Sequence, residues 1–405
     1  MRYTKEEVMQ YVIEEDVKFI RLAFCDVFGK QKNISIMPGE LERAFTHGIA
    51  FDASAISGFG DEANSDLFLF PEPHTLNWLP WRPEHGKVVR MFCDIRYPDG
   101  TPFTADTRAL LKRAVEDAKK AGYTFYFGAE EEFYLFLLDD KNMPTNIPYD
   151  DAGYMDIAPD DRGENVRREI CLTLEQMGIR PEGSHHEQGP GQNEIDFRYA
   201  DALTAADNAM TFQTVVKTIA RRNGLYADFS PKPLDGYPGN GLHINLSCEP
   251  GHNEESLKSM IAGIMDRIVP MTAFMNPHRD SYKRLGQMKA PVYVSWAKGN
   301  RSQLIRIPYA EGEYRRAELR SPDPSSNPYI AFALTIWAAL YGLEKGLSLP
   351  EPRELNLFTA SGKDVEGLKV LPSSLEEARA AALNDSFIKE HLPREITDIY
   401  LKAID

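Results

Sequence analysis

The sequence has few cysteines, and their spacing argues against a disulfide framework. Only four occur in 405 residues: Cys25, Cys93, Cys171 and Cys248. No two form a C-x-x-C pair, and their spacing is not that of a stapled scaffold. This usage is typical of a cytoplasmic protein with buried thiols.

Positive charge and long apolar runs are also scarce. Lysine and arginine number 46 against 61 acidic residues, a formal net charge of −15. Such a surface repels phosphate backbones and anionic lipid, so neither nucleic acid nor a membrane is an expected partner. The longest apolar run, 330–343, is too short to span a bilayer and predicts a buried core helix. The N-terminus shows no apolar signal core.

The usual phosphate-binding loops are missing as well. The chain contains no G-x-x-x-x-G-K-[ST] loop and no G-x-G-x-x-G that follows a predicted strand. Any nucleotide handling must therefore use a different arrangement of residues.

The order of predicted elements favours an α+β fold with a largely antiparallel sheet, because helices and strands do not strictly alternate. A turn-rich segment at 97–102 predicts a boundary between a small domain, 1–103, and a larger one, 104–405. Helical periodicity is found near 4–15, 104–120, 163–178, 202–222, 254–275 and 327–345. β-prone runs are found at 17–24, 33–37, 88–95, 123–138, 192–199, 226–230, 241–248, 302–308 and 314–320.

Acidic side chains interrupt one strand that should be apolar. In the run from Gly128 to Phe136, Glu130 and Glu132 project to one face of the strand and Glu131 to the other. Two like charges on one buried face are costly unless cations compensate them. An edge strand with a solvated face is the alternative.

Further polar residues stand on neighbouring strands. Glu187 ends a Gly- and Pro-rich turn, and Glu194 enters the next strand. His243 lies in an apolar alternating strand, where it could also be a satisfied core residue. The last group has charges of alternating sign on one face of a strand: Arg316, Glu318 and Arg320. Such a strand face could equally be exposed to solvent.

Together these segments supply five carboxylates, one imidazole and several guanidinium groups. Oxygen-rich coordination with one histidine suits Mg²⁺ or Mn²⁺. Arginines beside such cations suit phosphate or carboxylate. The combination indicates phosphoryl-transfer chemistry.

The ordered motifs resemble type I glutamine synthetase from about residue 15 to residue 395. They include Glu130-Glu131-Glu132-Phe133 and His185-His186-Glu187 through Glu194. The remaining matches are 51–56, 231–233, 239–243, 281–285, 300–302 and 318–324.

The resemblance implies a small N-terminal β-grasp domain and a larger catalytic domain with a curved antiparallel sheet. It implies a ligase that uses ATP to activate glutamate as γ-glutamyl phosphate, followed by amination with ammonia. Active sites would lie between neighbouring subunits of a homo-oligomeric ring, with Asp52 delivered from the adjacent chain. Because relatives continue beyond the position of Asp405 into an arm that reaches the opposing ring, the expectation is a hexamer that stacks weakly into a dodecamer.

Site residues follow from the same resemblance. Two or three Mg²⁺ or Mn²⁺ ions are implied, one held by Glu132, Glu187 and Glu194 and another by Glu130, His243 and Glu318. The phosphoryl group would be stabilised by Arg301, Arg306 and Arg316. Glutamate would be bound by Arg284, Arg320 and the backbone of Gly239, beside Glu132 and His243. Nucleotide contacts would include Glu182, Tyr199 and Ser247 with Arg301 and Arg306, and the ammonium pocket would be Asp52, Tyr154 and Glu187.

Several positions depart from the family pattern. The flap 286–289 is one residue short, and Lys289 stands where a glutamate is expected. Other departures are Ala55, Pro238, Asn245 and Lys369. A protonated lysine repels ammonium, so poor affinity for ammonium is expected. A γ-glutamyl ligase for an organic amine or polyamine, and a non-catalytic relative, remain the alternative functions.

Overall fold

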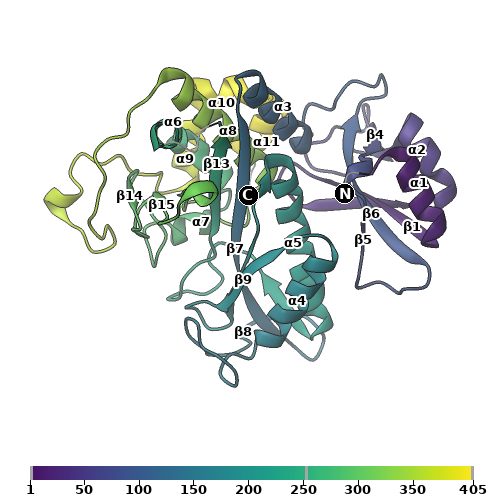
Figure 1. Ribbon diagram of the computed structural model, residues 1–405, viewed down its shortest axis with the longest axis horizontal. Coiled ribbons are helices and arrows are strands. Elements are labelled where there is room, and N and C mark those ends of the chain that lie inside the picture. Colours follow the sequence, from purple (N-terminus) through teal and green to yellow (C-terminus); the bar gives the residue numbers. More distant parts are fainter. Residues whose placement is uncertain (1–2, 251–253, 403–405) are drawn as a thin grey trace.

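The computed structural model describes residues 3–250 and 254–402 and contains two separate sheets. The strands before residue 97 form one sheet and the strands after residue 123 form the other. In Figure 1 the first sheet lies to the right, and β7 (Thr124–Leu138) runs through the middle of the larger part.

The N-terminal sheet begins after a capped helix. In α1 (Lys5–Glu14), Thr4 and Glu7 form the capping box that the sequence contains. The β-prone runs at 17–24 and 33–37 form a hairpin of β1 (Val17–Cys25) and β2 (Gln31–Ile36), and α2 (Leu41–His47) follows. The strand order is β2-β1-β6-β4-β3, in which only β1 and β6 run parallel. The remaining strands are β3 (Ile49–Asp52), β4 (Asp66–Pro71), β5 (Asn77–Trp78) and β6 (Lys87–Arg96).

The larger sheet has the order β14-β15-β16-β13-β7-β10-β9, and β7 also pairs with β8, β11 and β12. Its pairs are antiparallel, as predicted, except that β14 and β15 run parallel, so the sheet is mixed. Both strands have only three residues, and so short a residue pattern does not indicate whether neighbouring strands run parallel or antiparallel. The sequence therefore did not predict this pair. Besides β7, the strands are β8 (Pro144–Pro148), β9 (Pro181–His186), β10 (Gln192–Phe197), β11 (Ala200–Asp201), β12 (Leu225–Asp228), β13 (Leu242–Glu249), β14 (Trp296–Lys298), β15 (Ile305–Ile307) and β16 (Ala317–Leu319).

The apolar run 330–343 is the centre of the buried helix α8 (Pro328–Lys345). This helix packs closely on α6 (Glu254–Met275), because a Cβ on Gly263 would lie 2.2 Å from the Ala338 carbonyl oxygen. Within the described residues, no helix is long and apolar enough to cross a membrane. The other helices are α3 (Thr107–Lys120), α4 (Glu164–Gln176), α5 (Ala202–Arg222), α7 (Arg279–Arg284), α9 (Leu375–Asn384), α10 (Ser386–His391) and α11 (Arg394–Lys402).

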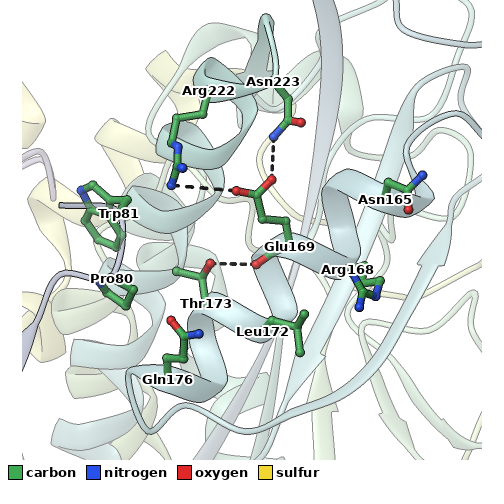
Figure 2. Close-up of a pocket in the computed structure, with 10 residues that line it drawn as sticks. All are labelled: Pro80, Trp81, Asn165, Arg168, Glu169, Leu172, Thr173, Gln176, Arg222 and Asn223. Atoms are coloured by element: carbon green, nitrogen blue, oxygen red, sulfur yellow. Dashed lines mark hydrogen bonds and ion pairs between the residues drawn. The ribbon is translucent and has the colours of Figure 1, made fainter. Parts of the chain in front are cut away.

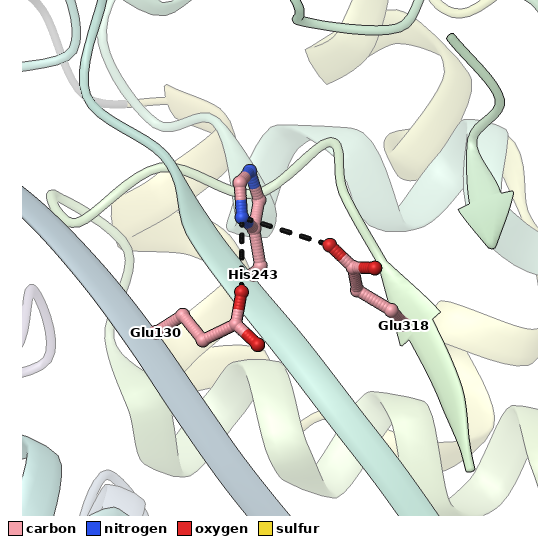
Figure 3. Close-up of side chains that lie close together, drawn as sticks. All are labelled: Glu130, His243 and Glu318. Atoms are coloured by element: carbon pink, nitrogen blue, oxygen red, sulfur yellow. Dashed lines mark ion pairs between the residues drawn. The ribbon is translucent and has the colours of Figure 1, made fainter. Parts of the chain in front are cut away.

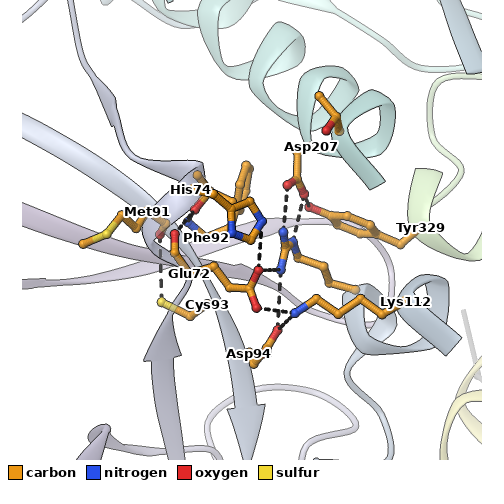
Figure 4. Close-up of polar contacts among 12 residues, drawn as sticks. Glu72, His74, Met91, Phe92, Cys93, Asp94, Lys112, Asp207 and Tyr329 are labelled. Atoms are coloured by element: carbon orange, nitrogen blue, oxygen red, sulfur yellow. Dashed lines mark hydrogen bonds and ion pairs between the residues drawn. The ribbon is translucent and has the colours of Figure 1, made fainter. Parts of the chain in front are cut away.

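A buried ionic network joins the N-terminal sheet to α3, α5 and α8 (Figure 4). The Arg108 guanidinium donates two hydrogen bonds of 2.9 Å to the Asp207 carboxylate, and the Tyr329 hydroxyl donates a third of 2.7 Å. On its other side Arg108 lies 3.6 Å from Glu72. Burial alone would raise the pKa of Glu72, yet Arg108 and Lys112 lower it to about 2.

Removing the Tyr329 hydroxyl tests this network. We expect Tyr329→Phe to lower the free energy of unfolding by about 1.5–3 kcal/mol, because a hydrogen bond to a buried carboxylate is lost. The shift of the urea midpoint measures this effect. Tyr309→Phe is the control because Tyr309 is 85% exposed, and equal midpoints for the two variants would contradict the expectation.

Candidate active site

The register of the larger sheet places acidic residues of three strands side by side. Glu130 on β7 lies opposite His243 on β13 and Asp196 on β10. Glu132 lies opposite Glu194 on β10. Strand alternation therefore gathers these side chains on one face of the sheet, called the acidic face below.

Glu131 points to the other face, as the alternation predicts. Its side chain is buried and accepts a hydrogen bond of 2.9 Å from Gln213 Nε2. Burial raises the pKa of this carboxyl group to about 8. Glu131 is therefore separate from the acidic face.

Glu130, His243 and Glu318 form one compact group (Figure 3). His243 Nδ1 lies 3.4 Å from Glu130 Oε2 and 3.7 Å from Glu318 Oε1. Burial, and then the charge of Arg320, hold the pKa of His243 well below its usual range. A neutral imidazole beside two carboxylates is a suitable ligand set for a divalent cation.

Two further groups contain the other predicted ligands and share Glu194. Glu132 and Glu194 lie with His243, whereas Glu187 and Glu194 lie with His185, and ligand atoms in each group are within 4.8 Å of one another. The expected set of Glu132, Glu187 and Glu194 is thus connected through Glu194 and is not one compact group.

Repulsion within these groups is visible in the carboxyl pKa values. Burial and the neighbouring Glu187 raise the pKa of Glu132 to about 7. Burial and Glu132 raise the pKa of Glu194 well above its usual range. Divalent cations would relieve this repulsion, so the donor set fits oxygen-coordinated metals.

Two arginines lie beside the acidic face, one on β15 and one directly after β16. Arg306 and Arg320 both form ion pairs with Glu318. The Nε atoms of both arginines are buried and have no hydrogen-bond partner among the described residues. Buried donors without partners are rare in folded proteins, so these two are suited to receive an anion.

The other predicted arginines are either bound by protein groups or exposed. Arg316 Nε donates to Asn245 Oδ1 at 2.7 Å, and Asn245 Nδ2 donates to Glu130 Oε1 at 2.7 Å. Arg284 is buried and donates to the Ser321 carbonyl oxygen at 2.8 Å. Arg301 is exposed, and so is Asp52, whose carboxylate accepts hydrogen bonds from Ser54.

Two glycines bring backbone close to the acidic face. The Gly241 N–H donates to Glu132 Oε2 at 2.6 Å, and a Cβ on Gly241 would lie 2.7 Å from His243 Nε2. A Cβ on Gly239 would lie 2.3 Å from the Pro231 carbonyl oxygen. The segment 239–243 therefore requires glycine for this close approach.

A cavity of about 250 Å³ opens beside Glu130, between β7, β9, β10 and β13. Tyr199 meets Tyr126 edge to face across it, with ring centroids 6.1 Å apart. Among the predicted residues it is lined by Glu130, Glu182, Tyr199, Ser247 and Arg316. Three of the five predicted nucleotide contacts thus lie at one cavity: Glu182 on β9, Tyr199 between β10 and β11, and Ser247 on β13. Arg301 and Arg306 do not line it.

A larger pocket of about 510 Å³ lies elsewhere, on α4 and α5 (Figure 2). Glu169 forms its centre and accepts a hydrogen bond of 2.9 Å from Asn223 Nδ2. None of the predicted site residues lines this pocket. The larger volume of this pocket therefore does not coincide with the predicted site.

Sequence reasoning missed three residues that lie within the site. Asp196 groups with Glu130 and Glu194, and burial and Glu130 raise its pKa to about 7. It follows Glu194 by two positions in the same strand, so the strand period could have identified it. His185 contacts Glu187, two positions after it, at 3.2 Å. Asn245 links Glu130 to Arg316 through contacts that arise only from tertiary structure.

Comparison with known proteins identifies the family. Residues 16–98 match the family described as "Glutamine synthetase, beta-Grasp domain", and residues 104–404 match "Glutamine synthetase, catalytic domain". The chain belongs to the glutamine synthetase family. Its fold, an N-terminal β-grasp domain before a catalytic domain with a curved mixed sheet, is that of the family.

Individual relatives of this glutamine synthetase-family chain agree in length and in name. A glutamine synthetase of Clostridium saccharobutylicum is 47% identical over 93% of this chain and 88% of its own length. One of Methanosarcina mazei is 45% identical over 99% of this chain and 93% of its own. A solved structure titled "GmaS/ADP complex-Conformation 1" has a TM-score of 0.87 at 26% identity, covering 98% of this chain and 94% of that one. These similarities support a glutamine synthetase-type ligase.

Proposed function

We propose that the chain is a glutamate–ammonia ligase that uses ATP to convert the γ-carboxylate of glutamate into γ-glutamyl phosphate, which ammonia then aminates. The observation that supports it most is the buried acidic face with two unpartnered arginine Nε atoms beside it. Mutually repelling carboxylates call for cations, and unpartnered guanidinium donors call for an anion. A divalent metal complex of ATP together with a carboxylate substrate would supply both the cations and the anions.

Two or three Mg²⁺ or Mn²⁺ ions are part of the proposal. Glu130, His243 and Glu318 would hold one ion. Another ion would be held by Glu194 together with Glu132 and Glu187, each of which shares a group with Glu194. When bound, such ions neutralise phosphate charge and polarise the substrate carboxylate.

Protein groups bind and orient the reactants in this proposal. Arg284, Arg320 and the backbone of Gly239 would hold the carboxylates of glutamate. Arg301, Arg306 and Arg316 would stabilise the charge of the transferring phosphoryl group. The cavity lined by Glu182, Tyr199 and Ser247 would hold the nucleotide of ATP.

The acceptor pocket would be formed by Tyr154 and Glu187 with Asp52 of a neighbouring copy. The Glu187 side chain is largely buried; burial acts to raise its pKa, but His185 and Lys289 outweigh it and lower the pKa below its usual value. An ionised carboxylate at this position attracts ammonium. Exclusion of water protects the acyl phosphate from hydrolysis.

We extend the proposal to assembly, domain limits and location. The active site would be completed between subunits of a homo-oligomeric ring, because Asp52 is exposed on the N-terminal sheet, where another copy can reach it. The domains are 1–103 and 104–405, and the four free cysteines support a cytoplasmic location.

An organic amine as acceptor is the second candidate, and Lys289 is the observation that favours it. Its ammonium group lies 3.5 Å from Glu187 Oε2. A glutamate at position 289 would instead have added a negative charge that attracts ammonium. The names of the relatives at 42–47% identity favour ammonia.

Phosphate release with ATP, Mg²⁺ or Mn²⁺, glutamate and a panel of amines tests the proposal. We expect release that requires glutamate and is increased by ammonium, although with a high KM for ammonium. A kcat/KM for methylammonium or a polyamine far above that for ammonium would replace ammonia by an organic acceptor. Absence of glutamate-dependent release with every amine would contradict ligase activity.

A further inference from the structure

The ammonium group of Lys289 occupies the cation position between Glu187 and Tyr154. Lys289 Nζ lies 3.5 Å from Glu187 Oε2 and 4.7 Å from the centre of the Tyr154 ring. A carboxylate and an aromatic face are the two groups that attract a small ammonium ion most directly. The lysine thus makes the contacts that a free ammonium acceptor would make.

The backbone of the flap holds this side chain in place. The Gly286 N–H donates to the Ala290 carbonyl oxygen at 3.1 Å, and the Ala290 N–H donates to the Gln287 carbonyl oxygen at 2.9 Å, which closes the turn. Within it, Met288 has φ +32° and Lys289 has φ +71°. Non-glycine residues adopt positive φ only where their surroundings compensate the strain, and such sites often accompany function.

The acidic partner is fixed as firmly as the lysine. Glu187 Oε2 also accepts the Gln188 N–H at 2.9 Å, and Glu187 Oε1 lies 3.2 Å from His185 Nε2. Tyr154 packs edge-on against the His185 ring, with centroids 5.5 Å apart. The side chain of Glu187 is 8% exposed and that of Lys289 is 37% exposed, so the lysine approaches from the solvent side.

We propose that Lys289 is a tethered competitor of the acceptor and sets the KM for ammonium. The inference rests on the proposed ligase function. Because the lysine is attached to the flap, its ammonium group is present at Glu187 at a millimolar or higher effective concentration. A free cation must displace it before it can contact Glu187 and Tyr154. Until then, the lysine covers the pocket.

Competition of this kind changes KM and leaves kcat nearly unchanged. At saturating ammonium the lysine is displaced, so the chemical steps proceed as they would without it. A lysine that stabilised the acyl phosphate or its formation would instead change kcat. The split between the two constants distinguishes a competitor from a catalytic group.

Steady-state kinetics of three flap variants test the inference in the metal-saturated, full-length protein. We expect Lys289→Met to lower the KM for ammonium about tenfold with kcat changed less than about twofold, in line with the loss of a tethered competitor. Lys289→Arg retains a cation and should keep a high KM. Lys283→Met is the matched control, because it removes a lysine, 65% exposed and paired with Asp280, from the adjoining helix α7.

A second measurement separates competition with ammonium from competition with the metal. The Mg²⁺ concentration for half-maximal activity, and the thermal midpoint as a function of Mg²⁺ without ammonium, should be the same in Lys289→Met and in the unmodified protein. A changed metal requirement with an unchanged KM for ammonium would overturn the inference and make Lys289 a counter-ion of the acidic face. An unchanged KM and an unchanged metal requirement would overturn it as well.

Failure of the inference and failure of the proposed function give different results. An active unmodified protein whose KM does not respond to Lys289→Met contradicts only the role of Lys289. An unmodified protein without glutamate-dependent phosphate release contradicts the ligase proposal, and the inference with it.

Discussion

Replacing Glu132 by glutamine is expected to reduce glutamate-dependent phosphate release about 1,000-fold or more while the fold is retained. Glu132 is buried, shares a ligand group with Glu194 and His243, and interacts unfavourably with Glu187. The amide keeps the shape but loses the charge that would bind a cation. Several kcal/mol of transition-state stabilisation are at stake, and each 1.36 kcal/mol is a factor of ten in rate.

The same substitution should not destabilise the metal-free protein. Burial and Glu187 raise the pKa of Glu132 to about 7, so its charged form is already disfavoured in the fold. A neutral amide removes that repulsion, and the thermal midpoint in a chelator should be unchanged or higher. Addition of Mg²⁺ should raise the midpoint of the unmodified protein more than that of the variant, because a ligand stabilises the state that binds it.

Glu366→Gln is the control for a simple change of charge, since Glu366 is exposed and far from the sheet in sequence. It should keep full activity and the full response to Mg²⁺. Near-normal turnover in Glu132→Gln would remove Glu132 from the proposed metal ligands. A lower midpoint in chelator would show that the charged carboxylate stabilises the fold.

Strand periodicity explains why much of the acidic face was predictable. The spacing of Glu130 and Glu132 predicted a shared face, and the register confirms that each lies opposite another acidic or imidazole group. The apolar run 330–343 predicted a buried helix, which is α8. In both cases the signal is local, because burial of one face or of a whole helix is expressed directly in the order of residues.

Contacts between distant segments could not be predicted in the same way. The grouping of His185 with Glu194, the ion pair of Glu318 with Arg306, and the placement of Lys289 beside Glu187 depend on how loops and strands meet. No periodicity records these distances. The parallel pairing of β14 with β15 was missed for the same reason.

The two unpartnered guanidinium nitrogens lie beside the acidic face, where they would contact substrate in the proposed function. Arg320 is 3% exposed, is paired through one terminal nitrogen with Glu318, and has a buried Nε without a partner among the described residues. Burial of an unsatisfied donor is unfavourable. The bound carboxylate of glutamate would satisfy it, so part of the binding free energy would come from completing this hydrogen bond.

Arg320→Lys is therefore expected to raise the KM for glutamate about 100-fold or more, with a smaller effect on the KM for ATP. Lysine keeps the positive charge but lacks the planar guanidinium group, which can bind Glu318 and a substrate carboxylate at the same time. One charge-assisted hydrogen bond of about 3 kcal/mol corresponds to a change of roughly 100-fold in affinity. Initial rates over a range of glutamate concentrations at saturating ATP measure it. Arg168→Lys on the exposed face of α4 is the control, and a normal KM for glutamate in Arg320→Lys would exclude this arginine from the glutamate site.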